Sequence, residues 1–244
     1  MAKRIYPTST HEVPEISDRA ETSRVLPLEN GDRLNRYEFE RRYTAMPEVK
    51  KAELIERIVH IQSPVHNSHA QSHSQWITWL GTYSAMTPGT LVSDNTTVRL
   101  GIDNEPQPDA LLRLTPEVGG TSHITEDDYI EGPPELIIEI AGSSAAIDVH
   151  DKKQMYRRNG VQEYLVWRVY DRQIDWWELV DSEYRPLSVD EQGVVQSRVF
   201  PGLCLAVAEL LQGNVAAVLT TLQQGMQTPD HTAFVERLTG AKEA

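Results

Sequence analysis

Two acidic residues and a lysine occupy positions from which they could act together on a phosphate ester. Asp109 follows Pro108 and precedes an apolar run at residues 110–114, so we expect it at the mouth of a strand. Glu139 lies inside a second apolar run, and Lys152 lies near the start of the helix predicted after it. Two carboxylates can share a divalent metal ion, and a lysine can hold or activate a water molecule. The chemistry that this set suits is phosphodiester hydrolysis.

Glu139 needs a physical explanation because its surroundings are apolar. Residues 135–141 are bounded by Gly-Pro-Pro before and by a glycine after, which is typical of a short buried strand. Alternation along a strand puts Glu135, Ile137 and Glu139 on one face. Burying a lone carboxylate costs on the order of several kcal/mol unless a metal or a partner compensates it. Of the two glutamates on this face, Glu139 lies nearer the strand end than Glu135 and is therefore the better ligand candidate.

A helix of about three turns is predicted from residue 148 to residue 160. Asp148 is the expected N-cap and Gly160 the expected C-terminal stop. Helical spacing places Lys152 on one face with Met155 and Tyr156, and Lys153 on a polar neighbouring face. We therefore expect Lys152 to point inward and Lys153 outward. The strand predicted at residues 163–167 would return beside the preceding one through this crossover.

An ordered series of short motifs runs through the same region. Its members are Pro108-Asp109, Glu135 to Ile140, Ser143-Ser144, Asp148, Lys152, Tyr156, Gly160-Val161 and Glu163-Tyr164. Over roughly residues 43–211 the series resembles the Uma family of endonuclease-like proteins, a branch of the PD-(D/E)XK superfamily. Two positions depart from the pattern. Ala141 stands where the superfamily usually has its lysine, which Lys152 would replace from the helix, and Arg57 stands where the family usually has a glycine.

The resemblance implies an α/β fold with a restriction-endonuclease-like mixed β-sheet flanked by helices. We expect an additional C-terminal hairpin at residues 164–179 and a helix at residues 207–222. Residues 1–40 are expected to form a flexible extension, residues 41–224 the domain, and residues 225–244 a tail. Within the domain, residues 46–55 are predicted to be a short helix, and residues 57–62 a strand.

The resemblance also assigns roles at the site. Asp109 and Glu139, with the main-chain carbonyl of Ile140, would bind Mg²⁺ or Mn²⁺. Lys152 would orient the attacking water or stabilise developing negative charge. Glu53, on the predicted helix, would orient a metal-bound water from the far side, although an exposed helical glutamate is an equally good interpretation of that residue alone.

The charge balance argues against a tight nucleic-acid complex. The chain has 36 acidic and 23 basic residues, a formal net charge of −13, whereas duplex-binding proteins usually present a basic patch. DNA is thus a substrate that the family implies and the composition disfavours. Two alternatives stay open: a non-catalytic binding module on the same fold, and a hydrolase of a small phosphate compound.

Three further features bear on partners and location. His69 and His73 are spaced like a zinc pair, but no third ligand is signalled, so a structural role is favoured. In Trp176-Trp177 one ring must face away from the sheet interior, and an exposed ring there would indicate a homodimer contact or another partner surface. No apolar stretch approaches the ~20 residues that span a bilayer, and the lone Cys204 is typical of a reducing compartment. We therefore expect a cytoplasmic protein with no membrane partner.

Overall fold

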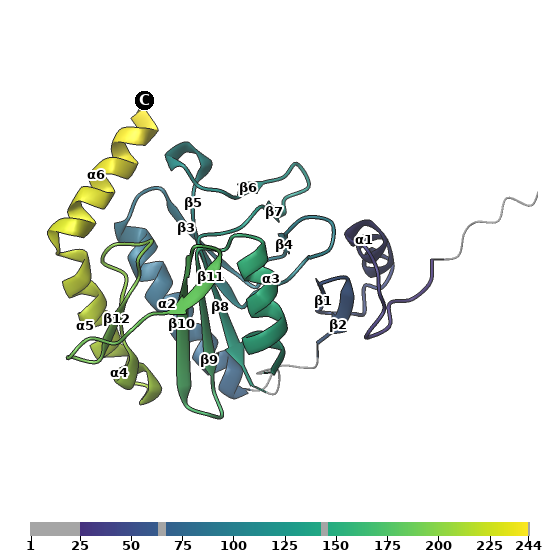
Figure 1. Cartoon of the computed structure of the whole chain (residues 1–244), viewed down its shortest axis with the longest axis horizontal. Coiled ribbons are helices and arrows are strands. Elements are labelled where there is room, and N and C mark those ends of the chain that lie inside the picture. Colours follow the sequence, from purple (N-terminus) through teal and green to yellow (C-terminus); the bar gives the residue numbers. More distant parts are fainter. Residues whose placement is uncertain (1–24, 63–66, 143–145, 244) are drawn as a thin grey trace, which may run out of the picture.

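A computed structural model describes residues 25–62, 67–142 and 146–243 of the chain (Figure 1). The motif serines Ser143-Ser144 and the first 24 residues of the predicted extension lie outside this described part. None of the described helices is long and apolar enough to cross a membrane.

The centre of the molecule is a mixed sheet of six strands in the order β11-β10-β9-β8-β5-β3. Only the pairing of β8 with β9 is parallel; the other neighbours are antiparallel. The predicted mixed α/β sheet and the crossover are therefore confirmed, as is the hairpin of β9 and β10. The strand bounds are β3 Thr90–Asp94, β5 Ala110–Leu114, β8 Leu136–Ala141, β9 Glu163–Arg168, β10 Gln173–Val180 and β11 Glu183–Pro186.

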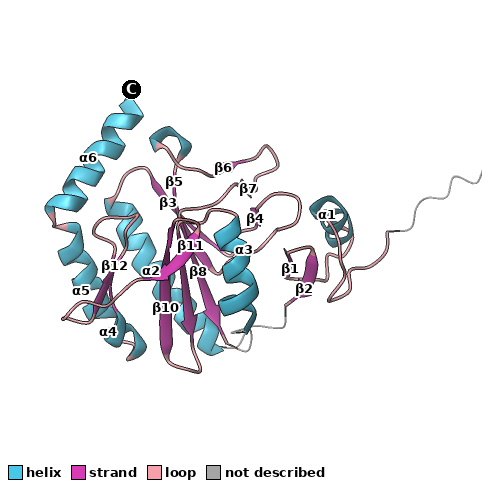
Figure 2. Ribbon diagram, viewed as in Figure 1, coloured by secondary structure: helices cyan, strands magenta, loops and turns pink. Residues whose placement is uncertain are grey.

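Helices cover both faces of this sheet, with α2 (Asn67–Met86) on one and α3 (Lys153–Arg158) on the other (Figures 1 and 2). Alternation along β8 explains how one strand serves two cores. Leu136, Ile138 and Ile140 pack with the tryptophans of α2. Ile137 packs on the opposite face with Met155 and Tyr156, the inward residues of the α3 region. A carboxylate on that second face, at Glu139, is consequently enclosed.

A smaller lobe sits beside the edge of the sheet and carries its own core. It consists of α1 (Arg36–Thr44) and the hairpin of β1 (Ala52–Ile55) and β2 (Ile58–Ile61), drawn on the right of Figure 1. Leu54, Phe39 and Val59 form the centre of this core. A short three-stranded sheet joins it to the rest; its strands are β4 Val98–Arg99, β6 His123–Ile124 and β7 Ile130–Glu131.

Two predicted helices are corrected. Residues 52–55, expected within a helix, form β1, because Leu54 is held on both sides, by Val59 of β2 and by an isolated bridge to Glu105. The helix expected at residues 207–222 is two helices, α4 (Val207–Leu211) and α5 (Val215–Met226). Gly213, with φ of 77°, lies between them in a left-handed conformation that a continuous helix does not allow.

The C-terminal elements pack against the α2 face of the sheet. A two-stranded sheet of β12 (Val194–Gln196) and β13 (Cys204–Ala206) precedes α4, and α6 (Pro229–Glu243) follows α5. Phe234 and Leu238 anchor α6 in the main core. Helix α1 (Arg36–Thr44) runs across the predicted boundary at residue 41, and α6 lies beyond the predicted boundary at residue 224.

The adjacent tryptophans of β10 face opposite sides of the sheet, as predicted. Trp176 is buried in the main core. Trp177 is half-buried, because its ring stacks on Tyr164 and carries the Lys153 ammonium 3.8 Å from its centroid. Since Trp177 is not an exposed ring, it gives no support to the homodimer, which stays a prediction.

Candidate active site

Lys152 is the centre of a buried ion cluster at the end of the sheet. Its Nζ lies 2.9 Å from Glu53 Oε1, 3.0 Å from Glu139 Oε1 and 3.7 Å from Asp148 Oδ1. The residue is 3% exposed, which confirms that Lys152 and not Lys153 faces the acids. Burial lowers the pKa of Lys152, but the three carboxylates more than reverse this, so its pKa is raised well above the usual value. The side chain is therefore a fixed cation.

The local fold that aims Lys152 inward differs from the predicted one. A π-helical segment, Ile147–Lys152, precedes α3, and the helical turns continue from residue 146 without a break. Asp148 is consequently not the N-cap that the sequence predicted; it is buried within the helical segment, one turn before Lys152. The predicted C-terminal stop is confirmed, since Gly160 has a φ of 83° just after the C-cap, Asn159.

Glu53 reaches the cluster from β1 and not from a helix. Because β1 alternates, Leu54 enters the core of the small lobe while Glu53 points the other way. Its carboxylate is fully buried and accepts hydrogen bonds from Lys152 Nζ, from Gln107 N at 2.7 Å and from Gln62 Nε2 at 2.6 Å. Burial raises the pKa of Glu53, but Lys152 and the other donors hold it below its usual value. Glu53 is therefore an anion, and both of its carboxylate oxygens already accept hydrogen bonds from the protein.

Glu139 is the acid of the cluster whose buried charge is least compensated by neighbouring cations and hydrogen-bond donors. Its Oε1 accepts from Lys152 Nζ and from the Tyr156 hydroxyl at 2.8 Å, and the residue is 2% exposed. Burial raises the pKa of Glu139 to about 8, and the negative charges of Asp109, Asp148 and Glu53 add to that effect against the opposing Lys152. Three carboxylates, those of Glu53, Glu139 and Asp148, therefore surround the one ammonium of Lys152.

Asp109 stands just before β5, at the strand mouth where it was predicted. Its Oδ2 accepts a hydrogen bond from Ile140 N at 2.7 Å and lies 3.3 Å from His69 Nε2, while Lys51 Nζ is 3.6 Å from Oδ1. Burial raises the pKa of Asp109, but these neighbours lower it to about 2. His73 supports the same residue through its main-chain oxygen, at 2.7 Å. The two histidines thus hold Asp109 and belong to the site.

The main chain of β8 turns Ile140 toward Asp109. Val169 N donates to Ala141 O, and Glu163 N donates to Glu135 O, so the odd-numbered residues of β8 direct their peptide groups to β9. The even-numbered ones, Ile140 among them, direct theirs to the other side, where Ile140 N meets the Asp109 carboxylate. The Ile140 carbonyl is directed to that side as well.

The donor set near Asp109 and Glu139 suits a hard divalent cation in its chemistry. Two carboxylates and a main-chain carbonyl are oxygen ligands of the kind that Mg²⁺ and Mn²⁺ prefer. Burial and the crowding by the carboxylates of Asp109, Asp148 and Glu53 raise the pKa of Glu139, and this crowding is the observation that favours a cation there. Among the described residues, however, no three His, Cys, Asp or Glu side chains are arranged as a preformed ion cage. The ligands that this site offers to Mg²⁺ or Mn²⁺ are therefore the carboxylates of Asp109 and Glu139 and the main-chain carbonyl of Ile140.

The sequence interpretation missed four contributors to this centre. Lys51, Gln62 and Gln107 all hold an acid of the site, and His69 contacts Asp109. A signal for Lys51 was present: once residues 52–55 are treated as a strand, Lys51 and Glu53 share a face. Gln107 acts through its main-chain amide, so no residue type could have indicated it.

Comparisons with known proteins bear on the family and on the fold. The Uma2 family model, described as "Putative restriction endonuclease", matches residues 36–208. A solved structure, described as a putative nuclease belonging to DUF820 from Anabaena variabilis, is similar to the chain at a TM-score of 0.54 and 14% sequence identity. The similarity covers 70% of this chain and 96% of that one, and at this identity it bears on the fold. No curated protein matches the sequence.

Proposed function

From the premise that the chain belongs to the Uma2 family, we propose that it is a metal-dependent endonuclease that hydrolyses phosphodiester bonds, with DNA as its substrate. The observation that carries the proposal is the contact of Lys152 with both Glu53 and Glu139 in a buried cluster beside Asp109. A carboxylate cluster with a surplus negative charge is unfavourable for folding and is explained by a cation that function requires.

Asp109, Glu139 and the carbonyl of Ile140 would hold Mg²⁺ or Mn²⁺. A metal bound there would polarise a phosphate oxygen and lower the pKa of a coordinated water. Lys152 stays charged at neutral pH, since its pKa is raised. It is therefore suited to stabilising negative charge on the phosphate rather than to removing a proton. Of the two roles predicted for Lys152 from the sequence, this favours stabilising developing negative charge over orienting the attacking water.

Glu53 serves the proposed reaction through Lys152. Its two oxygens already accept from Gln62, Gln107 and Lys152, so it is placed to fix the lysine rather than to orient a water. We assign Glu53 as a positioning residue. His69 and Lys51 would keep Asp109 ionised, because both lower its pKa, and an ionised carboxylate is the better metal ligand.

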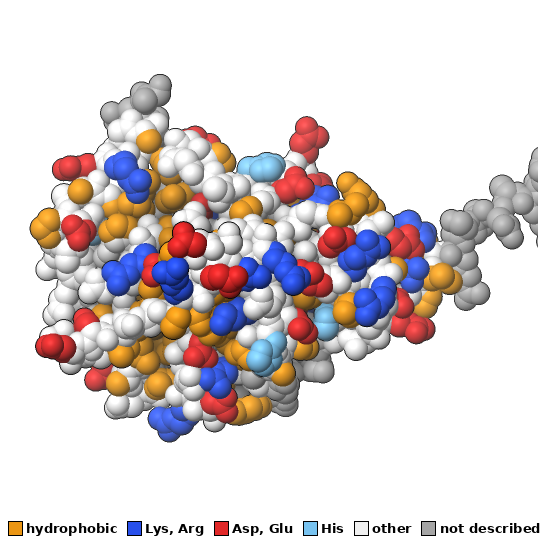
Figure 3. All heavy atoms as spheres, in the orientation of Figure 1, with side chains coloured by type: hydrophobic (Ala, Val, Ile, Leu, Met, Phe, Trp, Pro, Cys, Tyr) orange, Lys and Arg blue, Asp and Glu red, His pale blue; other side chains and the backbone are white. Residues whose placement is uncertain are grey.

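The outer surface bears on the choice of substrate. On the face shown in Figure 3, basic and acidic side chains are interspersed and do not separate into a large basic field. This pattern, with the net charge of −13, predicts weak binding of DNA, because few basic side chains are grouped to contact the phosphates. It also keeps the small-phosphate hydrolase as a second candidate, since a small substrate needs no extended basic surface.

Cleavage assays on the purified full chain test the proposal. Mg²⁺ or Mn²⁺ would be titrated against single-stranded DNA, duplex DNA, RNA and the small diester bis(p-nitrophenyl) phosphate. Cleavage of a polynucleotide by the wild type, lost in Asp109→Asn, supports the endonuclease. Cleavage of the small diester alone favours the second candidate. Stabilisation by Mg²⁺ that depends on Asp109, without any cleavage, would instead identify a binding module.

A further inference from the structure

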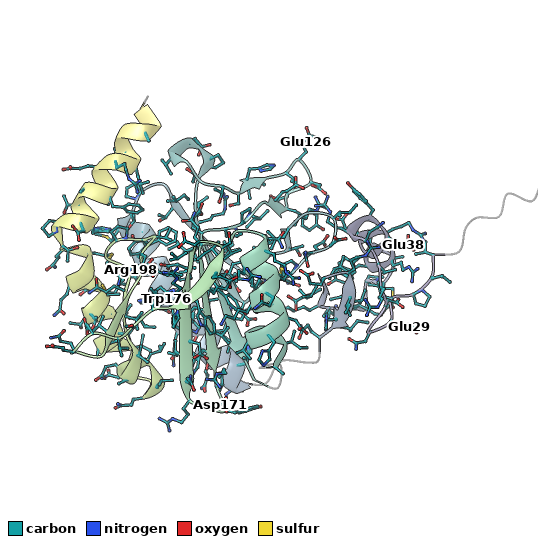
Figure 4. All side chains as sticks on the ribbon, viewed as in Figure 1. Glu29, Glu38, Glu126, Asp171, Trp176 and Arg198 are labelled. Atoms are coloured by element: carbon teal, nitrogen blue, oxygen red, sulfur yellow. The ribbon has the colours of Figure 1, made fainter. Side chains whose placement is uncertain are left out.

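A polar hollow lies at the small lobe, apart from the candidate active site. Its volume is about 190 Å³, and it opens between α1, β4 and the loop that joins β6 to β7. The residues that matter in its wall are Glu40, Tyr43, Arg99, Glu105, Asp127 and Tyr129. Figure 4 shows Glu126 at the tip of the same loop, pointing away from the body of the protein.

Glu105 is the residue that requires an explanation. It is only 4% exposed, and within the described part of the chain its Oε2 has no hydrogen-bond donor. A buried carboxylate oxygen without a donor has lost its hydration without compensation, which is unfavourable. Because Glu105 lines the hollow, a bound group could supply the donor.

The surrounding arginines do not satisfy this need. Arg99 donates from Nε to Glu40 at 2.8 Å and from its two terminal nitrogens to Asp127 at 2.8 and 2.9 Å. Arg36 donates to Glu131 at 3.2 Å and lies 3.7 Å from Glu40. Two guanidinium groups therefore face four carboxylates, those of Glu40, Glu105, Asp127 and Glu131. In addition to burial, Glu40 raises the pKa of Glu105, as a neighbouring carboxylate does. The pair is left with an excess of negative charge.

We propose that this hollow is a binding site for a small primary ammonium ion, held by the carboxylates of Glu105 and Glu40. An ammonium group offers three donors and one positive charge, and Glu105 Oε2 lacks a donor within the described part of the chain. The rings of Tyr43 and Tyr129 would line the path of its alkyl chain. A divalent metal is a poorer fit, because the guanidinium of Arg99 already contacts Glu40.

The hollow lies behind the strand that carries Glu53 and does not belong to the candidate active site. Glu105 exchanges both main-chain hydrogen bonds with Leu54, at 2.8 and 3.1 Å, and Leu54 points away from the Lys152 cluster. The inference therefore stands whether or not the chain is a nuclease, and its test needs no cleavage.

A proton is the natural competitor for this position. Burial, together with the hydrogen bond to Glu40 and the charge of Glu40, raises the pKa of Glu105 to about 8 against the opposing charges of Arg99 and Arg36. Below that pH the pair holds a proton, which an ammonium ion must displace. Affinity should therefore rise by roughly tenfold or more between pH 6.5 and pH 8.5.

Calorimetric titration with putrescine at constant ionic strength tests the site. We expect the wild type and the exposed-charge control Glu126→Gln to bind equally, and Glu105→Gln to bind at least tenfold more weakly. Glu40→Gln is a second variant in case Glu105→Gln does not fold, which circular dichroism would reveal. Tetramethylammonium, which cannot donate a hydrogen bond, should bind at least tenfold more weakly than putrescine.

Three results would overturn the inference. One is equal affinity of the wild type, Glu105→Gln and Glu40→Gln for putrescine. Another is equal binding of putrescine and tetramethylammonium, which would indicate nonspecific attraction to an acidic surface. The third is an affinity for putrescine that does not change between pH 6.5 and pH 8.5.

Discussion

The ammonium of Lys152 lies 2.9 Å from a carboxylate oxygen of Glu53, although 99 residues separate them in sequence. The contact joins the small lobe to the crossover helix, since Glu53 comes from β1 and Lys152 from the segment before α3. The same ammonium reaches Glu139 on β8 at 3.0 Å. One buried cation thus ties together three parts of the fold, so its loss should affect both stability and the proposed chemistry.

Lys152→Met should destabilise the protein by about 3–5 kcal/mol, because it leaves Glu53, Glu139 and Asp148 without their shared cation. Lys153→Met is the matched control on the next residue. It removes only a contact with the Trp177 ring and should cost about 0.5–1 kcal/mol. Urea unfolding of both variants measures the difference. Equal losses would contradict the assignment of Lys152 as the central cation.

Glu139→Gln should stabilise the metal-free protein at alkaline pH and abolish metal-dependent cleavage. The folded pKa of Glu139 is about 8 against an ordinary 4.5, so the folded state binds an extra proton between these values. Wild-type stability then falls as pH rises from about 4.5 through about 8, by on the order of a few kcal/mol. Glutamine cannot ionise, so the variant should lack this fall.

Thermal unfolding from pH 5 to pH 9, with and without Mg²⁺, measures both effects on one preparation. Mg²⁺ should stabilise the wild type more at higher pH and leave Glu139→Gln almost unaffected. Glu126→Gln, an exposed acid far from the cluster, should follow the wild type throughout. Full cleavage by Glu139→Gln would remove Glu139 from the proposed ligands.

The sheet and the inward lysine could be predicted because their signals are local. The apolar run around Glu139 and the helical spacing of Lys152, Met155 and Tyr156 fix which side chains meet, whatever the rest of the chain does. Glu53 could not be placed in this way. Its neighbours Lys50, Lys51, Ala52 and Leu54 are good helix formers, and only pairing with β2 and Glu105 makes the segment a strand.

The break between α4 and α5 could have been predicted from the sequence Gln212-Gly213-Asn214, because a glycine often ends a helix and an asparagine often caps the next one. An apolar pattern continues on both sides, so the periodicity alone favours one helix. The glycine adopts φ of 77°, and Asn214 caps α5 by accepting from Ala217 N. The π-helical segment before α3 had no comparable signal, since it depends on burial of Asp148 and Lys152 together.

Glu163→Ala should destabilise the fold by about 3–5 kcal/mol without any direct effect on the proposed site. The Glu163 carboxylate is fully buried and accepts from Trp176 Nε1, Ser197 Oγ and the main-chain amides of Arg198 and Val199. Alanine would leave Trp176 Nε1, Ser197 Oγ and Arg198 N without this acceptor, whereas Val199 N keeps its bond to Ser197 Oγ at 3.2 Å. Glutamine should also be destabilising, because its amide group would face donors. Burial raises the pKa of Glu163 to about 7, so the stabilisation that Glu163 gives falls as pH rises through that value, and urea unfolding at pH 5 gives the clearest comparison. A loss below about 1 kcal/mol would mean that water replaces the acid.

Arg57→Gly should stabilise the protein by about 0.5–1 kcal/mol, since Arg57 holds a backbone conformation that glycine adopts without strain. Glu56 and Arg57 form the two-residue turn between β1 and β2, with φ of 49° and 69°. The main-chain bonds of Arg57, to Asp103 O and from Leu34 N, do not need its side chain. The side chain makes only an exposed ion pair with Asp103 at 3.5 Å, which contributes little.

Arg57→Ala is the matched control, because it removes the same ion pair and keeps the strain. Chemical denaturation should rank glycine above arginine and alanine below glycine; equal stability of the two variants would show that the turn is not strained.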